Sequence, residues 1–119
     1  GRAPSSGARP TLSRAFAQLV AHVHTVRPPV LIRIESAGSY DDAQWWAHAY
    51  LSAYEVLGKS EYLASGQKIF DAVYAEAWDT GACSGGMWWS RAQSYKNAIT
   101  NELALFASAR LFLLTGDAK

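Results

Sequence analysis

The sequence is poor in cysteine and contains none of the common metal-binding motifs. Cys83 is the single cysteine among 119 residues, so no disulfide can form within the chain and a small disulfide-stabilised fold is excluded. HExxH and CxxC are absent, and His22 and His24 are two residues apart, which places them on different faces of a helix. We therefore expect no metal ion and no other cofactor.

The sequence also lacks a large excess of positive or negative charge, and it lacks long apolar runs. The formal net charge is +1, which is too small for a nucleic-acid-binding surface. No apolar run approaches the roughly 20 residues of a membrane helix, so we expect neither nucleic acid nor a membrane span. Residues 1–10 lack the apolar stretch of a signal peptide and leave the compartment open. The segment GACSGG has no following lysine and no GxSxG motif occurs, which argues against phosphate binding and a serine nucleophile.

Two segments of unlike composition make up the chain. Residues 1–40 contain five arginines, one glutamate and all four prolines, whereas 13 of the 15 aromatic residues follow residue 40. Large apolar surface therefore lies in the second segment, which should build the core. We expect a disordered tail at residues 1–10, an N-terminal helix and linker at residues 11–38, and a helical domain at residues 39–119.

Apolar residues recur at helical spacing along most of the chain. The expected helices run from Thr11 to Arg27, from Asp41 to Leu57, from a cap at Ser60 to about Trp78, and from about Tyr95 to Leu114. Residues 78–93 contain three glycines and should form a long loop or a short hairpin. Superposing Gly58 on Gly116 aligns Tyr54 with Phe112, which indicates a weak internal repeat. Such a repeat is typical of all-α folds built from helical hairpins.

Asp41 and Asp42 are the sharpest local feature, because they open an apolar helix that is rich in tryptophan. Adjacent acids are common at helix N-termini, where they cap free amides and interact favourably with the helix dipole. They could also lean into one cleft at the separation of about 5 to 5.5 Å that retaining glycoside hydrolysis requires. In that case one carboxylate attacks and the other donates a proton.

Two tryptophan pairs, Trp45-Trp46 and Trp88-Trp89, offer flat apolar rings on which sugars can stack. Adjacent helical residues point about 100° apart, so one ring of the first pair can pack in the core while the other faces a cleft. The second pair follows a glycine-rich loop, a setting that favours exposure to a ligand. Further polar contacts could come from residues near the start of the last helix, although capping would also explain these residues: Tyr95, Asn97, Asn101 and Glu102.

Three motifs in order, DDAQWW, GGMWW and YKNAITNEL, resemble glycoside hydrolase family 76, the endo-α-1,6-mannanases. The resemblance runs from Ser39 to Asp117, and residues 11–38 do not match the family. It implies an all-α fold in which helical hairpins form part of an (α/α)6 barrel, with the cleft at the helix ends. It implies hydrolysis of α-1,6-linked mannan with retention at the anomeric carbon. Position 48 departs from the pattern, since a histidine stands where the family favours an apolar residue.

The resemblance assigns Asp41 as the nucleophile and Asp42 as the general acid/base. It places Trp88, Trp89 and Asn97 near the cleft, and we add Trp45 to these substrate-binding residues from the helix geometry described above. Members of the family are typically secreted or attached to the cell surface. The expected partner is α-mannan or a mannooligosaccharide.

Alternatives to this function follow from the length of the chain, which corresponds to about a third of such a barrel, so that the chain could be an incomplete fragment of the hydrolase. The first alternative is a non-catalytic helical module that binds glycan or a protein partner. Open barrel faces would then favour self-association. Another (α/α)6 sugar enzyme, such as an epimerase or a lyase, would leave the DDxxWW motif unexplained.

Overall fold

Helix α3 (Tyr40–Leu57) begins and ends at residues suited to those positions. The computed structural model of the protein describes residues 14–22 and 38–117. Ser39 precedes the helix in an extended conformation, and its hydroxyl accepts a hydrogen bond from the Asp42 backbone N–H at 3.3 Å. Gly58 follows the helix with a φ of 72°, which glycine adopts without strain, and its N–H donates to the Tyr54 carbonyl.

Helix α5 (Ala98–Thr115) repeats these features. The Asn97 side chain caps its start by accepting from the Thr100 N–H at 2.9 Å, and Gly116 ends it by donating to the Phe112 carbonyl. Both helices are 18 residues long, and their caps coincide when the two glycines are superposed. The first helix of the predicted repeat and its two caps therefore recur among the described residues. The predicted start near Tyr95 was too early, because Asn97 acts as the cap.

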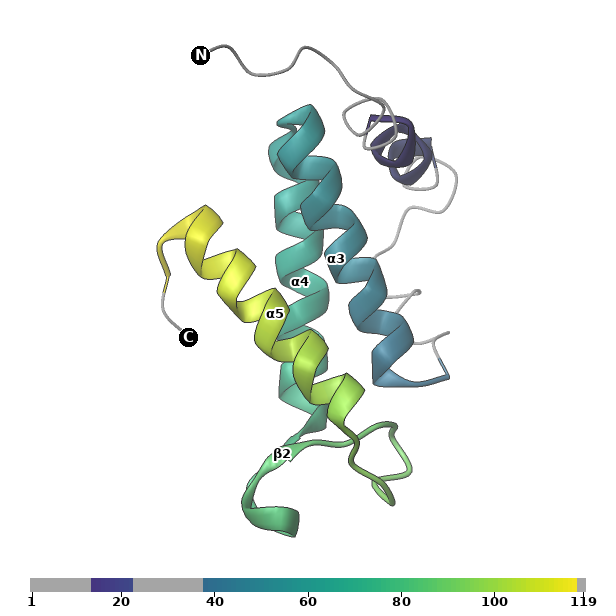
Figure 1. Ribbon diagram of the computed structural model, residues 1–119, viewed down its shortest axis with the longest axis vertical. Helices are drawn as coiled ribbons and strands as arrows, with labels where there is room; N and C mark the ends of the chain where they lie inside the picture. Colours follow the sequence, from purple (N-terminus) through teal and green to yellow (C-terminus); the bar gives the residue numbers. More distant parts are fainter. Residues whose placement is uncertain (1–13, 23–37, 118–119) are drawn as a thin grey trace, which may run out of the picture.

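Helix α4 (Ser60–Ala77) runs antiparallel to α3 and forms a helical hairpin with it (Figure 1). The prediction that Ser60 caps this helix was wrong. Lys59 holds the capping position in an extended conformation without a side-chain hydrogen bond, so Ser60 is already helical.

A short β-hairpin joins α4 to α5. Strand β1 (Trp78–Asp79) pairs antiparallel with β2 (Gly86–Met87), and a 3-10 turn at Ala82–Ser84 lies between them. Lys96 fixes the turn: its ammonium group lies 2.8 Å from the Asp79 carboxylate and donates to the Ala82 carbonyl at 2.7 Å. This ion pair and the Ala82 N–H, which also hydrogen-bonds to the carboxylate, hold the pKa of Asp79 below its usual range.

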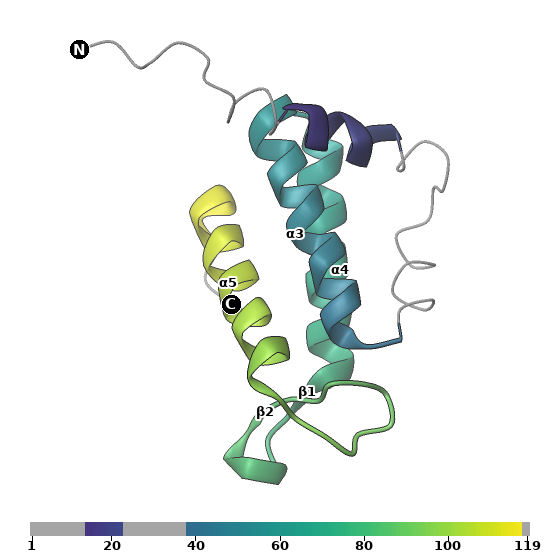
Figure 2. The same cartoon turned by 45° about the vertical axis from the view of Figure 1, so that its right-hand side comes forward.

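The described part of the N-terminal segment is helical over residues 14–22 and packs on the core through Ala17 and Val20. Figure 2 shows it lying across the far end of the α3–α4 hairpin from the β-hairpin. The rest of the predicted Thr11–Arg27 helix, the predicted tail at residues 1–10 and most of the linker lie outside the described residues.

The described core lies between α3 and α4, with α5 packed against both. Helices α3 and α5 point the same way, so both begin at the end of the molecule where the β-hairpin lies (Figures 1 and 2). The expected all-α class is confirmed. Among the described residues, α5 is the one helix with the length and hydropathy that a membrane span needs. Core helices of soluble proteins also meet these two criteria.

His48, the unusual residue of α3, is buried and hydrogen-bonded at both ring nitrogens. Arg110 donates to its Nδ1 at 2.9 Å, and the Leu103 carbonyl lies 3.1 Å from its Nε2. A carbonyl can only accept, so Nε2 carries a proton. Nδ1 accepts from Arg110 and therefore carries none, so the ring is neutral. Arg110 also reaches the Glu55 carboxylate at 2.9 Å. The histidine thus joins α3 to α5.

Burial lowers the pKa of His48 below its ordinary value of 6.5. As the pH falls below that value, the unfolded chain takes up a proton at this residue before the folded chain does, so the free energy of unfolding should fall. We expect the melting temperature to decrease between about pH 7.5 and about pH 5.5, and to decrease less in a His48→Gln variant. Equal decreases in the two proteins, followed by circular dichroism, would contradict this role of His48.

Candidate active site

Three segments meet at the end of the molecule where α3 and α5 begin. The Tyr40 N–H donates to the Trp89 carbonyl at 2.8 Å, and the Trp89 N–H donates to the Tyr95 carbonyl at 2.8 Å. These bonds bind the segment that precedes α5 to the first turn of α3. Residues distant in sequence, Asp41 and Trp89, are thereby held at one end of the fold.

The two predicted carboxylates differ in their surroundings. Asp41 is partly buried, and its Oδ1 accepts a hydrogen bond from the Thr100 hydroxyl of α5. Asp42 is exposed, and its backbone N–H is the group that Ser39 caps. One carboxylate is therefore held in place by the neighbouring helix, and the other faces solvent beside it.

Thr100 is at the centre of the contact between the two helix starts. It is fully buried and uses three polar groups: its hydroxyl donates to Asp41, its N–H donates to Asn97, and its carbonyl accepts from the Gln44 Nε2 at 3.0 Å. Gln44 is also fully buried. A buried polar group is costly unless it is paired, so these bonds fix how α3 and α5 meet.

A second set of polar contacts ties the start of α3 to the end of α4. The Tyr40 hydroxyl donates to the Glu76 carboxylate at 3.2 Å, and Arg91 donates to the same carboxylate oxygen at 3.0 Å. Burial and, to a lesser extent, the charge of Glu76 raise the pKa of Tyr40 above its usual range, so the hydroxyl keeps its proton. The first turn of α3 is thus held from two sides.

The first tryptophan pair divides as the helix geometry predicts. Trp46 is partly buried and packs against the core, whereas Trp45 is 57% exposed. Both rings border an open apolar cavity of about 250 Å³ between α3 and the helical residues 14–22, which neither predicted carboxylate lines. Trp45 lies one turn along α3 from Asp41.

The second pair lies in the segment between β2 and α5. Trp88 is partly buried, and the Lys96 ammonium lies 4.7 Å from its ring centroid, so one face of the ring is covered. Trp89 is 37% exposed and meets Tyr95 edge to face. Trp89 is the more accessible ring for a ligand.

Two of the four polar residues predicted near the start of α5, Asn97 and Asn101, stabilise the fold. Asn97 caps the helix, as the capping interpretation predicted. The Asn101 Oδ1 accepts from the Met87 N–H at 3.0 Å and so fixes β2 against α5. Glu102 and Tyr95 are exposed.

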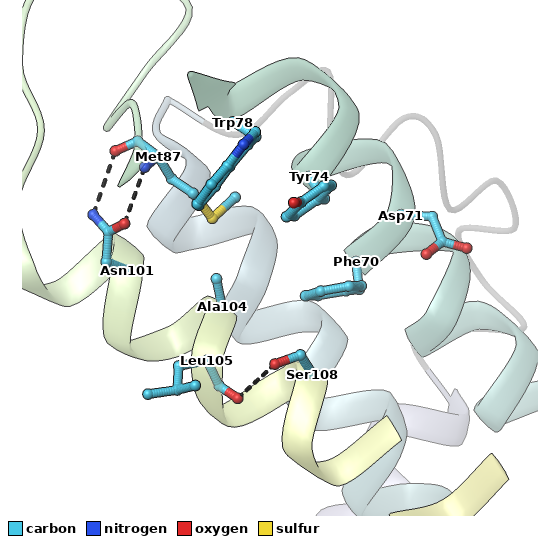
Figure 3. A pocket seen from close by; sticks show the side chains of 9 residues that line it. All are labelled: Phe70, Asp71, Tyr74, Trp78, Met87, Asn101, Ala104, Leu105 and Ser108. Atoms are coloured by element: carbon cyan, nitrogen blue, oxygen red, sulfur yellow. Dashed lines mark hydrogen bonds between the residues drawn. The ribbon is translucent and has the colours of Figure 1, made fainter. Parts of the chain in front are cut away.

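A larger cavity, of about 340 Å³, lies elsewhere, between α4, α5 and the β-hairpin (Figure 3). Phe70, Tyr74 and Trp78 line its α4 side as a row of stacked rings. Its single carboxylate is Asp71, whereas acid-base glycoside hydrolysis uses a pair. Asn101 is the one predicted contact residue that lines it, and neither predicted carboxylate does, so we place the candidate site at the starts of α3 and α5. The described residues contain no cluster of His, Cys, Asp or Glu that could hold a metal ion.

Comparison with solved structures supports the fold. The chain resembles the crystal structure of the Lin0763 protein from Listeria innocua, with a TM-score of 0.65 and 22% sequence identity. The alignment covers 95% of this chain and 37% of that chain, so this chain spans little more than a third of that protein's length. Comparison with curated proteins gives no significant match.

A family profile supplies the decisive comparison. The profile of glycosyl hydrolase family 76 matches residues 31–119, a range that includes the described residues of α3, α4, the β-hairpin and α5. It begins before Ser39, where the motif-based resemblance begins, and contains both Asp41 and Asp42. The chain therefore belongs to glycosyl hydrolase family 76.

Proposed function

We propose that the protein hydrolyses α-1,6-linked mannan with retention at the anomeric carbon, with Asp41 as the nucleophile and Asp42 as the general acid/base. The observation that carries this assignment is the unequal setting of the two carboxylates. Asp41 is held against α5 by Thr100, whereas Asp42 is exposed beside it. An attacking group profits from a fixed orientation, and a proton donor must exchange protons with water between turnovers.

The reaction then takes two steps. Asp41 attacks the anomeric carbon while the bond to the leaving oxygen breaks, and Asp42 gives that oxygen its proton. The product of this step is a mannosyl ester of Asp41. Asp42, now ionised, takes a proton from a water molecule whose oxygen attacks the same carbon and releases the Asp41 carboxylate. Two inversions give net retention.

Exposed aromatic rings near the carboxylates support a sugar ligand. Trp89 is exposed in the segment that is hydrogen-bonded to the first turn of α3, and Trp45 is exposed one turn further along α3, on the side of residues 14–22. The apolar C–H faces of sugars stack on such rings, and we assign both to substrate binding. Trp88 and Asn97, which the fold already engages, would add contacts at the edge of the cleft.

Digestion of linear mannans tests the proposal. We expect the purified chain to release oligosaccharides from α-1,6-mannan, and not from α-1,2- or α-1,3-linked mannooligosaccharides of equal length, as followed by chromatography. Release from all three linkages would contradict the proposed specificity. Release from none of them, by a chain shown to be folded, would contradict the proposed catalysis.

A second candidate function is a helical module that binds glycan or protein without catalysis. The exposed face of α5 favours it, because Leu105 is 71% exposed and Leu113 is 81% exposed. Large exposed apolar side chains on one helix are typical of an interaction surface. Binding of mannan without any released product, together with a molecular mass above that of a monomer in light scattering, would favour this alternative.

A further inference from the structure

Thr100 occupies an unusual place for a helical threonine. A threonine hydroxyl inside a helix commonly donates to a carbonyl of its own preceding turn. Here it donates across the helix contact to the Asp41 Oδ1, from a fully buried position. The contact joins residues 59 positions apart in the sequence.

The direction of the Thr100 hydroxyl is fixed by its surroundings. Its own N–H is bound by the Asn97 cap at 2.9 Å, and its carbonyl is bound by Gln44 at 3.0 Å. The backbone on both sides of the side chain is therefore held, and a helical threonine has two common χ1 rotamers, of which the buried hydroxyl here occupies the one that reaches Asp41. Asp41 thus meets a donor with a set position.

We propose that Thr100 is a positioning residue for the nucleophile. A hydrogen bond to Oδ1 sets the plane of the Asp41 carboxylate and leaves the second oxygen, Oδ2, to attack the anomeric carbon. Holding a reacting group in its attacking geometry lowers the barrier of the step in which it attacks, with little effect on substrate binding. This inference rests on the proposed function of Asp41.

Two substitutions separate the hydroxyl from the packing at this position. Thr100→Val keeps the shape and removes the donor, and Thr100→Ser keeps the donor and removes a methyl group. On α-1,6-mannan we expect Thr100→Val to lower kcat by about ten- to a hundredfold with a KM changed less than about twofold. We expect Thr100→Ser to retain most of the activity. Circular dichroism shows whether both variants are folded.

A substrate with an aryl leaving group separates an effect on the nucleophile from an effect on the proton donor. A dinitrophenyl α-mannoside needs no proton donor when its bond breaks, so Asp42→Asn should release the first equivalent of dinitrophenol at nearly the parental rate. The Thr100→Val variant should release dinitrophenol slowly, because the orientation of the Asp41 carboxylate is affected and Asp41 is needed for this step.

The outcomes distinguish the two proposals. A folded parent chain without activity on either substrate would overturn the proposed function, and the role of Thr100 with it. An active parent whose Thr100→Val variant keeps the parental kcat would overturn the positioning role alone. So would a Thr100→Ser variant that is folded and as slow as Thr100→Val.

Discussion

The Asp42→Asn variant is expected to hydrolyse α-1,6-mannan about 10²- to 10⁴-fold more slowly than the parent, because the leaving oxygen loses its proton donor and the water loses its base. The Asp41→Asn variant should lose at least as much, since an amide cannot form the glycosyl ester that the first step requires. Initial rates on linear α-1,6-mannan, measured for the three proteins side by side, check both values.

Neither substitution should unfold the chain. The Asp41→Asn variant keeps a side-chain oxygen that can accept from the Thr100 hydroxyl, and position 42 is exposed with its backbone N–H capped by Ser39. Loss of an acid from the first turn of a helix costs about 0.3–1 kcal/mol. Glu61→Gln is the matched control, because Glu61 is an exposed acid in the first turn of α4, at the other end of the hairpin. A Glu61→Gln variant as slow as Asp42→Asn would contradict the assignment.

The Gly66→Leu variant is expected to lose about 3 kcal/mol or more of unfolding free energy, because α3 and α4 approach each other closely at this residue. A Cβ on Gly66 would lie 2.9 Å from the Leu51 Cδ2 and 3.2 Å from the Ala47 carbonyl oxygen. The leucine side chain can adjust, but the backbone oxygen belongs to α3 and can move only with that helix. The better helix propensity of leucine returns only about 1 kcal/mol.

Thermal unfolding measures this loss, which corresponds to a decrease of about 10–20 °C in the melting temperature. Ala64→Leu adds the same side chain two residues earlier, at an exposed position of the same helix, and should change the stability by less than about 0.5 kcal/mol. Equal melting temperatures of the two leucine variants would contradict the close contact at Gly66. Because Gly66 is distant from the starts of α3 and α5, where the candidate site lies, the activity of the Gly66→Leu variant should be proportional to its folded fraction.

Much of the helical framework could be predicted because its signals are local. Gly58 and Gly116 end their helices through a backbone conformation that favours glycine, and their superposition alone revealed the repeat. The cap of α4 was misjudged because serine is a good capping residue anywhere, and only the backbone shows that Lys59 holds the position. The start of α5 was placed too early for a similar reason. Tyr95 is apolar enough to fit the helical pattern, although the helix begins only after Asn97.

The contacts that complete the candidate site could not be predicted, because they join distant residues. Asp41 and Asp42 were visible in the sequence as a pair, but nothing local shows that Thr100 binds the first and leaves the second exposed. The repeat offers one signal: superposing the two helices places Thr100 at the position of Asp42, on the third residue after the cap. The role of Lys96, which covers Trp88 and binds Asp79, also depends on how the β-hairpin folds back.

The anomeric configuration of the first product tests the central claim most directly. Proton NMR during the digestion of linear α-1,6-mannan, before mutarotation equilibrates the sugars, should show the α-anomer forming first, because attack by Asp41 followed by attack by water inverts the carbon twice. First appearance of the β-anomer would mean that water attacks directly. It would contradict Asp41 as the nucleophile and, with it, the part given to Thr100.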